Sequence, residues 1–219
     1  MKRVLEPEVM DTAAEAADYD AMDHAEVNAR FCEDLLAETA ALRSPVLDVG
    51  TGTALIPIEL CKRAPGIEVL GIDLAEHMLS LARHNVARAG FQRRVRVERV
   101  DAKALPYEDG AFGTTISNSI VHHIPEPRAV LAEMWRVTAP GGLLFVRDLV
   151  RPEGPAEIER LVALYGGSHP PARELFRASL HAGLTIPEVE EILGNIGAAS
   201  AVVRMTSDRH WTLSCVRRA

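Results

Sequence analysis

The sequence predicts an α/β fold with a doubly wound, mostly parallel sheet of seven strands and an antiparallel last strand. Two observations support this prediction. Between residues 46 and 149, short apolar runs typical of buried strands alternate with apolar residues at helical spacing, which implies right-handed β-α-β units with helices on both faces of the sheet. Residues 200–219 then contain two strand-like runs separated by a polar turn, which predicts a closing hairpin.

The chain begins with a helical region. Residues 11–43 are rich in Ala, Glu, Asp and Leu, and Val27, Phe31 and Leu35 recur at helical spacing, which predicts one or two helices ending before Ser44 and Pro45. The expected elements then follow in order: a strand at 46–50, a helix ending at 63, a strand at 67–73, a helix at 74–90, a strand at 94–102, a loop at 103–113, a strand at 114–120, a helix at 127–138, a turn at 139–142 and a strand at 143–149.

The alternation ends after Arg151. Two helical patterns with a Gly-Gly-Ser-His-Pro-Pro interruption replace the short crossover that would be enough there, which predicts a small helical insertion after the fifth strand. A helix at 186–197 leads into the hairpin. We therefore predict a single domain with four parts: an N-terminal helical cover (1–44), a core (45–151), a helical cap (152–185) and a closing helix and hairpin (186–219).

Composition and charge exclude several classes of function. The 219 residues are 47% hydrophobic, which allows one sizeable core, and their net charge of −7 disfavours a nucleic acid partner. No apolar run reaches the roughly 18 to 20 residues of a membrane helix, and the acidic start does not resemble a signal peptide, so we expect a cytoplasmic protein. Three widely separated cysteines predict neither a disulfide framework nor a zinc site, and no metal is expected.

Gly50 and Gly52 lie between the first predicted strand and the first core helix. In parallel sheets ligands bind outside the carboxyl ends of the strands, glycines permit a close approach of the backbone, and the following helix presents unpaired amides. A dinucleotide fingerprint starting at Gly50 requires Gly or Ala at position 55, where this chain has Leu55. The two glycines therefore favour a nucleotide-like ligand other than a dinucleotide. The alternative is that they only form a tight turn, without a ligand.

The segment from Asp48 to Ala54 resembles the first motif of the class I S-adenosylmethionine-dependent methyltransferases, an acidic residue followed by G-x-G-x-G, with Ala54 in place of the last glycine. Three later segments resemble further motifs of this family in order: GIDLAEHML, VDAKALPYEDGAFG and AEMWRVTAPGGLLFV. Gly113 departs from the usual Asp. The resemblance, to small-molecule, UbiE-like members, covers roughly residues 46–150 and implies a Rossmann-like fold whose seventh strand runs antiparallel between the fifth and sixth.

The resemblance also implies which residues hold S-adenosylmethionine, whose product is S-adenosylhomocysteine. Asp73 would accept both ribose hydroxyls, and Asp101 would receive the adenine amine with Ala102 beside the ring. The alternatives are that Asp73 only caps a helix and that Asp101 is a solvated loop acid. The expected cofactor-binding residues are Asp48, Gly50, Thr51, Gly52, Asp73, Leu74, Met78, Asp101, Ala102, Asn118, Ser119 and Tyr19.

Methyl transfer requires an acceptor held in line with the carbon–sulfur bond and, for some acceptors, a base. Because histidine titrates near neutrality, His122 and His210 are the candidate general bases, and Asp148 is the third candidate catalytic residue. The alternatives are that one of the neighbours His122 and His123 packs against a helix and that His210 only satisfies a turn.

Other residues near the expected site have two interpretations. Arg147 and Arg151 either bind an anionic substrate group or form salt bridges to Asp148, and Trp211 belongs either to the core or to the pocket wall. The N-terminal helix either covers one sheet edge or closes over the methionine end of the cofactor through three side chains, Tyr19, Met22 and Asn28.

The favoured function is S-adenosylmethionine-dependent methyl transfer to a small molecule under the helical cap. One alternative is an RNA or protein methyltransferase, although Ser117-Asn118-Ser119-Ile120 stands where such enzymes have an Asn-Pro-Pro-Tyr-type tetrad. Another is a protein that binds the cofactor without catalysis. The sequence leaves open the acceptor atom and the oligomeric state, a homodimer included.

Overall fold

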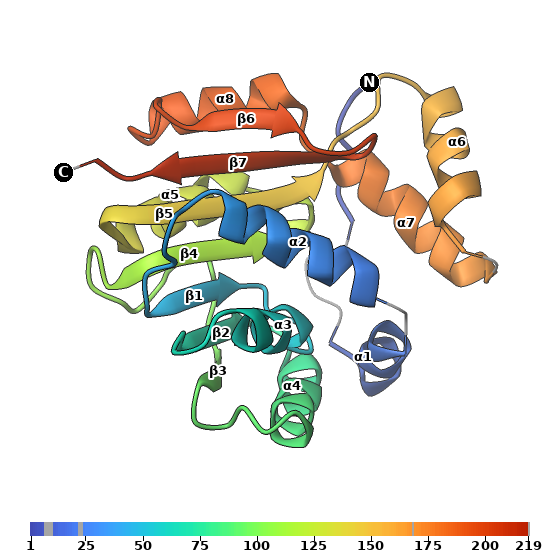
Figure 1. Cartoon of the computed structure of the whole chain (residues 1–219). Coiled ribbons are helices and arrows are strands. Elements are labelled where there is room, and N and C mark those ends of the chain that lie inside the picture. The colour runs from blue at the N-terminus through green and yellow to red at the C-terminus, as the bar shows by residue number, and fades with distance from the viewer. Residues whose placement is uncertain (7–10, 22–23, 168, 219) are drawn as a thin grey trace.

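The protein is built on one seven-stranded sheet with the order β3-β2-β1-β4-β5-β7-β6. Figure 1 shows the computed structural model, which describes residues 1–6, 11–21, 24–167 and 169–218. The first five strands pair in parallel, and β7 is antiparallel to both of its neighbours, as predicted. The strands are β1 Val46–Val49, β2 Val69–Asp73, β3 Val95–Arg99, β4 Phe112–Asn118, β5 Thr138–Leu149, β6 Val202–Met205 and β7 His210–Val216.

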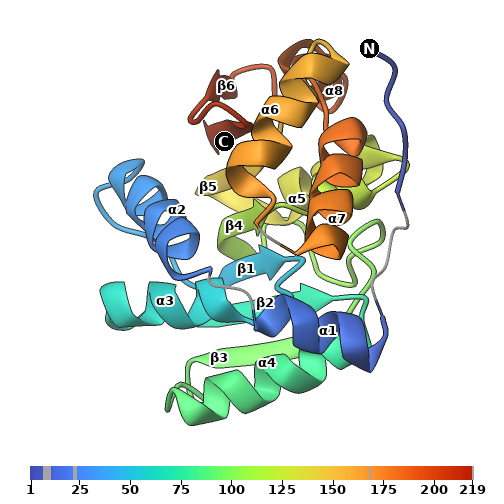
Figure 2. The ribbon, with the colours of Figure 1, turned by 90° about the vertical axis from the view of Figure 1, so that its right-hand side faces the viewer.

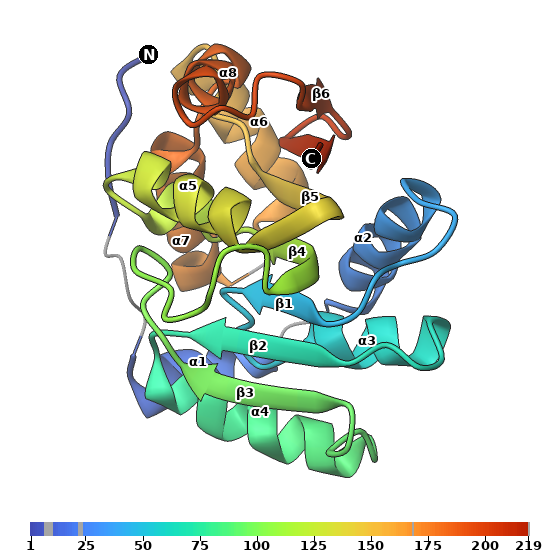
Figure 3. The same cartoon turned by 90° about the vertical axis from the view of Figure 1, so that its left-hand side faces the viewer.

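Helices cover both faces of the sheet, because successive strand side chains point to opposite sides. Leu143 and Phe145 pack with α2 (Ala25–Ala37), α3 (Leu55–Arg63) and α4 (Glu76–Arg88) on one face. Leu144 and Val146 pack with α5 (Pro127–Val137) and α8 (Ile186–Asn195) on the other. Figure 3 shows the two layers of helices, viewed from the end of the sheet at which the parallel strands begin. The near-continuous apolar strand runs thus reflect burial on both faces.

Three further helices lie beyond the carboxyl ends of the parallel strands. They are α1 (Ala13–Asp20), α6 (Pro155–Tyr165) and α7 (Pro170–Ala182), which face the viewer in Figure 2. The last two form the predicted insertion and share a small apolar core with Leu149 at the end of β5. A short 3-10 helix, η1 (Val121–His123), follows β4 and packs against α7 and α5.

The N-terminal residues 1–6 run beside this end of the molecule. Val4 donates its amide to the carbonyl of His181 in α7 over 3.1 Å. The guanidinium of Arg3 donates to the carbonyls of Ala182 (2.6 Å), His122 (2.9 Å) and Ile124 (2.9 Å). One arginine therefore joins the start of the chain to α7 and η1.

Some element boundaries differ from the prediction. The expected turn at 139–142 continues β5, because the backbone of Gly141 and Gly142 pairs with Arg217. The departure at Gly113 has a local cause: a Cβ there would lie 2.7 Å from the carbonyl oxygen of Arg43, so the close approach of this segment requires glycine. In the part of the chain that the structure describes, no helix combines the length and apolarity needed to cross a bilayer.

Candidate functional site

A pocket opens at the carboxyl edge of the sheet, at the point where the strand order reverses between β1 and β4. About 840 Å³ of space, open solvent at the mouth included, lies within it. Residues following four parallel strands contribute to it, together with α1 and η1. The lining residues are Tyr19, Gly50, Gly52, Ile72, Asp73, Leu74, Ala75, Met78, Val100, Asp101, Ala102, Lys103, Asn118, Ser119, Ile120, His123 and Ile124.

The glycine loop after β1 forms one wall of the pocket. Gly50 has φ +76°, and a Cβ there would lie 2.1 Å from Cγ2 of Ile120, so the position excludes any side chain. Gly52 has φ +53° and faces the ring of Tyr19, 3.7 Å from where a Cβ would be. Ala54 keeps the left-handed conformation (φ 61°, ψ 28°) and buries its methyl group, which explains how alanine replaces the third glycine of the motif.

Asp48 and Thr51 lie behind the loop instead of lining the pocket. The Thr51 hydroxyl donates to Oδ2 of Asp48 over 2.7 Å, and Asp48 is only 2% exposed. Burial raises the pKa of Asp48 to about 7, against the opposing hydrogen bond from Thr51. The hydrogen-bonded pair supports the loop from the core, and a contact of either residue with the cofactor stays a prediction.

Asp73 connects the end of β2 to the glycine loop. Its Oδ2 accepts the amide of Gly52 over 2.9 Å, and its Oδ1 accepts the amide of Ala75 over 3.0 Å. Burial raises the pKa of Asp73, while these backbone amides oppose the shift. The contact with Ala75 corresponds to the alternative in which Asp73 only caps the following helix. Asp73 makes this contact and also lines the pocket.

The far end of the pocket is polar and more open. Asp101 accepts the amide of Lys103 over 2.9 Å, and its Oδ1 lies 3.0 Å from the Lys103 ammonium. Burial favours a higher pKa for Asp101, but these two contacts of Lys103 lower it. Asp101 is therefore a carboxylate at neutral pH, held beside Ala102 in the pocket wall.

Tyr19 closes the pocket from α1. The helix packs on α4 through Ala16 and Met78, and the Tyr19 ring lies 4.5 Å from that of His24. Burial raises the pKa of Tyr19 to about 12, and the nearby carboxylate of Asp73 adds to the shift. Of the other two residues predicted for this helix, Met22 lies outside the described residues, and Asn28 belongs to α2 and does not line the pocket.

None of the three residues predicted to be catalytic lines the pocket. His122 is buried and bonds through Nδ1 to Asp148, which also accepts the amide of Val121 over 2.6 Å. Although burial favours a lower pKa, the negative charge of Asp148 raises the pKa of His122. The side chains of His122 and Asp148 lie behind the residues that line the pocket. Their catalytic role stays a prediction.

His210 lies at the start of β7, beside the end of β5, as predicted. Its Nδ1 lies 2.9 Å from the hydroxyl of Ser207 within the hairpin turn. Burial lowers the pKa of His210 to about 4, so the imidazole is neutral at physiological pH and a weak base. This placement corresponds to the structural alternative, in which His210 satisfies a turn.

The two arginines have partners that the sequence did not indicate. Arg147 pairs with Asp34 of α2 over 2.7 Å, and Arg151 pairs with Glu188 of α8 over 2.6 Å. The predicted salt bridges to Asp148 are therefore wrong, because helices on the two faces supply closer carboxylates. Trp211 is fully buried and belongs to the core.

The pocket histidine is His123, which the sequence analysis did not select. Its side chain is 20% exposed and lines the pocket, whereas its neighbour His122 is 3% exposed. The two rings lie 4.2 Å apart between centroids, but only His123 reaches the pocket wall. The sequence indicated the pair of His122 and His123 as a candidate. It did not indicate which of the two rings faces the pocket, because that depends on the packing of η1. The apolar wall residues Ile120 and Ile124 were also missed.

Comparison with known proteins agrees with this geometry. Residues 46–142 match the family model described as a methyltransferase domain. The match contains the glycine loop, Asp73 and Asp101, and ends at residue 142 within β5, so the N-terminal and C-terminal parts of the chain lie outside it.

Relatives of this chain differ in the acceptors that their names state. A demethylmenaquinone methyltransferase of Thermus thermophilus is 40% identical over 123 residues, 56% of this chain and 54% of the relative. A phosphatidylethanolamine N-methyltransferase of Cereibacter sphaeroides is 34% identical over 122 residues, 55% of this chain and 59% of the relative. The chain thus spans about half the length of the curated relatives it matches.

The fold extends over the whole chain. A crystal structure described as an S-adenosylmethionine-dependent methyltransferase from Methanococcus maripaludis superposes with a TM-score of 0.76 at 17% identity. The superposition covers 100% of this chain and 98% of the other. The N-terminal and C-terminal parts of the chain therefore follow an architecture seen in a solved structure.

Proposed function

We propose that this protein transfers a methyl group from S-adenosylmethionine to a small-molecule acceptor. The observation that carries the proposal is the pocket wall, in which Gly50, Gly52, Asp73 and Asp101 meet at the carboxyl edge of the sheet. A glycine loop, a ribose-binding carboxylate and a second acid at the next strand end match the three parts of an adenosyl amino acid.

The proposed cofactor contacts follow from these positions. The amino-acid part lies over the loop of Gly50 and Gly52, where the backbone permits close approach. Asp73 accepts the ribose hydroxyls with the lone pairs that its backbone bonds leave available. The adenine lies beside Ala102 with its amine toward Asp101. Tyr19 and Met78 supply apolar cover.

The acceptor side of the proposal rests on in-line displacement. The bound sulfonium makes its methyl carbon electrophilic, so the protein's task is to orient the acceptor and exclude water. Asn118 at the end of β4 and Ser119 and Ile120 after it face the pocket at the switch point. We assign the role of a cap over the acceptor to α6 and α7, which lie beyond β5. We assign His122 and Asp148 a positioning role, because they hold η1 and thus the pocket wall.

The test has two stages. Calorimetry with S-adenosylmethionine should show one binding site on the folded chain, and labelled S-adenosylmethionine should then transfer its methyl group to a component of the small-metabolite fraction of a cell extract. No binding by a folded chain would overturn the proposal. If the label is found only in RNA or protein, the acceptor is a macromolecule and the small-molecule proposal is wrong. If S-adenosylmethionine binds but its methyl group is transferred in no fraction, the protein binds the cofactor without catalysis.

A further inference from the structure

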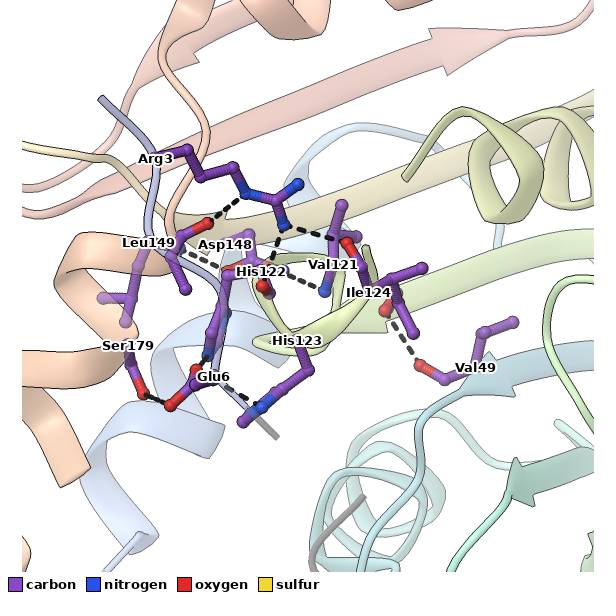
Figure 4. A network of polar contacts seen from close by, with 12 residues as sticks. Arg3, Glu6, Val49, Val121, His122, His123, Ile124, Asp148, Leu149 and Ser179 are labelled. Carbon is purple, nitrogen blue, oxygen red and sulfur yellow. Dashed lines mark hydrogen bonds and ion pairs between the residues drawn. The ribbon is translucent and has the colours of Figure 1, made fainter. Parts of the chain in front are cut away.

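Three side chains converge beside the pocket from two distant parts of the chain (Figure 4). Glu6 belongs to the N-terminal segment, while His122 and His123 belong to η1. Oε1 of Glu6 lies 3.4 Å from Nε2 of His122 and 3.3 Å from Nδ1 of His123. The three ligand atoms all lie within 4.8 Å of one another. The side chain of Glu6 is only 6% exposed.

These separations differ from those of a direct charged hydrogen bond. Charge-assisted N–H···O bonds are typically about 2.7 to 2.9 Å long, whereas both contacts of Glu6 Oε1 are longer. Among the residues that the structure describes, this buried oxygen accepts no hydrogen bond. Donors bound tetrahedrally to Zn²⁺ at about 2.0 to 2.1 Å lie roughly 3.3 to 3.4 Å apart. The two distances at Glu6 match that spacing.

The surroundings of His122 fit the same interpretation. Metal-binding histidines usually donate their second ring N–H to a carboxylate, which fixes the tautomer and the ring orientation. Nδ1 of His122 bonds to Asp148, so Nε2 is the nitrogen directed at Glu6. Asp148 is itself held by the amides of Val121 and Leu149, each over 2.6 Å. A ring anchored in this way is a preorganised ligand.

We propose that Glu6, His122 and His123 bind one divalent cation of the zinc class. Two imidazoles and one carboxylate are a donor set that Zn²⁺ accepts, and three protein ligands leave a further position for water or another small ligand. Because His123 also lines the pocket, the cation lies at the pocket wall. It also ties the N-terminal segment to η1, next to the contacts that Arg3 makes with the same helix.

The experiment measures metal binding without the methyl donor, so its outcome is separate from that of the proposed function. The chelator-treated full chain is titrated with Zn²⁺ by calorimetry and with Co²⁺ by visible absorption. We expect one Zn²⁺ per chain, a Co²⁺ spectrum typical of tetrahedral coordination, and a higher melting temperature with Zn²⁺, because a ligand that binds only the folded state stabilises it.

Variants identify the ligands. Glu6→Gln keeps the size of the side chain and should lower Zn²⁺ affinity at least 10-fold, as should His123→Asn. Asp148→Asn should lower affinity about 10- to 100-fold through the orientation of His122. His77→Asn is the matched control, because His77 lies 3.0 Å from the carboxylate of Asp11 on the surface, away from the cluster, and should bind Zn²⁺ like the unaltered chain.

Circular dichroism without metal checks that each variant is folded, and His123→Asn serves if Glu6→Gln is not. Either of two results would overturn the site: no saturable binding near one equivalent by the unaltered chain, or equal Zn²⁺ affinity in the unaltered chain and in every folded ligand variant. A loss of affinity in His77→Asn equal to that in the ligand variants would move the binding to the surface and equally overturn it.

Discussion

At the scale of single residues, the pocket separates side chains that touch a ligand from those that support them. Asp73 lines the pocket and also anchors Gly52 and Ala75, whereas Asp48 is buried behind the loop. Both carboxylates follow neighbouring parallel strands, and their different burial gives them different tasks. Residue type and spacing alone do not distinguish these tasks.

Asp73 should dominate cofactor affinity. Asp73→Ala removes the carboxylate proposed for the ribose hydroxyls, and losing hydrogen bonds to a charged group costs about 1.5 to 3 kcal/mol, so S-adenosylmethionine should bind about 10- to 100-fold more weakly in calorimetry. His210→Ala is the matched comparison, since this ring lies outside the pocket wall. It should change the dissociation constant less than about 2-fold. Equal losses in both variants would contradict the assignment of these two residues.

The buried Asp48 should make stability depend on pH. Its pKa is raised from 3.8 to about 7 by burial, so the folded state binds the proton more tightly than the unfolded state. Its contribution to stability is therefore full below pH 3.8 and is lost as the pH rises through about 7.

Asp48→Asn removes this titration. The melting temperature of the variant minus that of the unaltered chain should therefore increase from pH 4 to pH 7 and stay constant at higher pH, as measured by scanning calorimetry. Glu108→Gln, at an exposed loop position, should show a much smaller trend. A difference for Asp48→Asn that does not vary with pH would contradict the raised pKa.

At the scale of elements, the strand-to-helix loops determine the site. The β1–α3 loop turns through Gly50 and Gly52 at positive φ, and the backbone amides of Gly50 and Thr51 both donate to the carbonyl of Ile72 over 2.9 Å. The loop is thus hydrogen-bonded to the neighbouring strand as well as to Asp73. Its shape is fixed before any ligand arrives.

A pair of glycine substitutions tests this loop. Gly50 and Gly66 both have positive φ, but a Cβ at Gly66 meets nothing within 4 Å, whereas at Gly50 it overlaps Ile120. Gly66→Ala should cost about 1 kcal/mol from the backbone alone and leave S-adenosylmethionine affinity unchanged. Gly50→Ala should cost more in chemical denaturation and weaken binding at least 10-fold. Similar effects of the two substitutions would show that the loop is not sterically constrained.

Much of the element order was predictable because strand runs, helical spacing and turn residues are local signals. The mostly parallel seven-stranded sheet and the antiparallel seventh strand between the fifth and the sixth are confirmed. The predicted ion-pair partners of Arg147 and Arg151 were wrong, and the position of η1 was not predicted. Both features depend on contacts between segments that are distant in the sequence. The carboxylates of Asp34 and Glu188 come from helices on opposite faces. No local pattern encodes such pairs.

At the scale of the whole molecule, the N-terminal part of the chain completes a site that the central motif only begins. The family match stops at residue 142, yet Tyr19 lines the pocket from the N-terminal part, and Arg3 and Glu6 reach η1. The pocket is therefore assembled from the sheet edge plus an N-terminal segment that lies outside the family match. This division explains why the sequence indicates the methyl donor more clearly than the acceptor.

A pocket assembled from so many elements should couple ligand binding to global stability. A ligand present at 100 times its dissociation constant stabilises the folded state by about 2.7 kcal/mol, and in a chain of 219 residues each kcal/mol raises the melting temperature by about 2 to 4 °C. S-adenosylmethionine and S-adenosylhomocysteine should thus each raise the melting temperature by about 5 to 11 °C in scanning fluorimetry.

NAD at the same concentration should have no effect, because Leu55 departs from the dinucleotide fingerprint. The shift should fall to about half or less in Asp73→Ala at the same ligand concentration, because an affinity that is about 10- to 100-fold weaker leaves only about 0.4 to 1.4 kcal/mol of stabilisation, whereas His210→Ala should retain the full shift. A comparable shift with NAD would mean that the pocket recognises adenosine alone, and the methyl-donor assignment would lose its support.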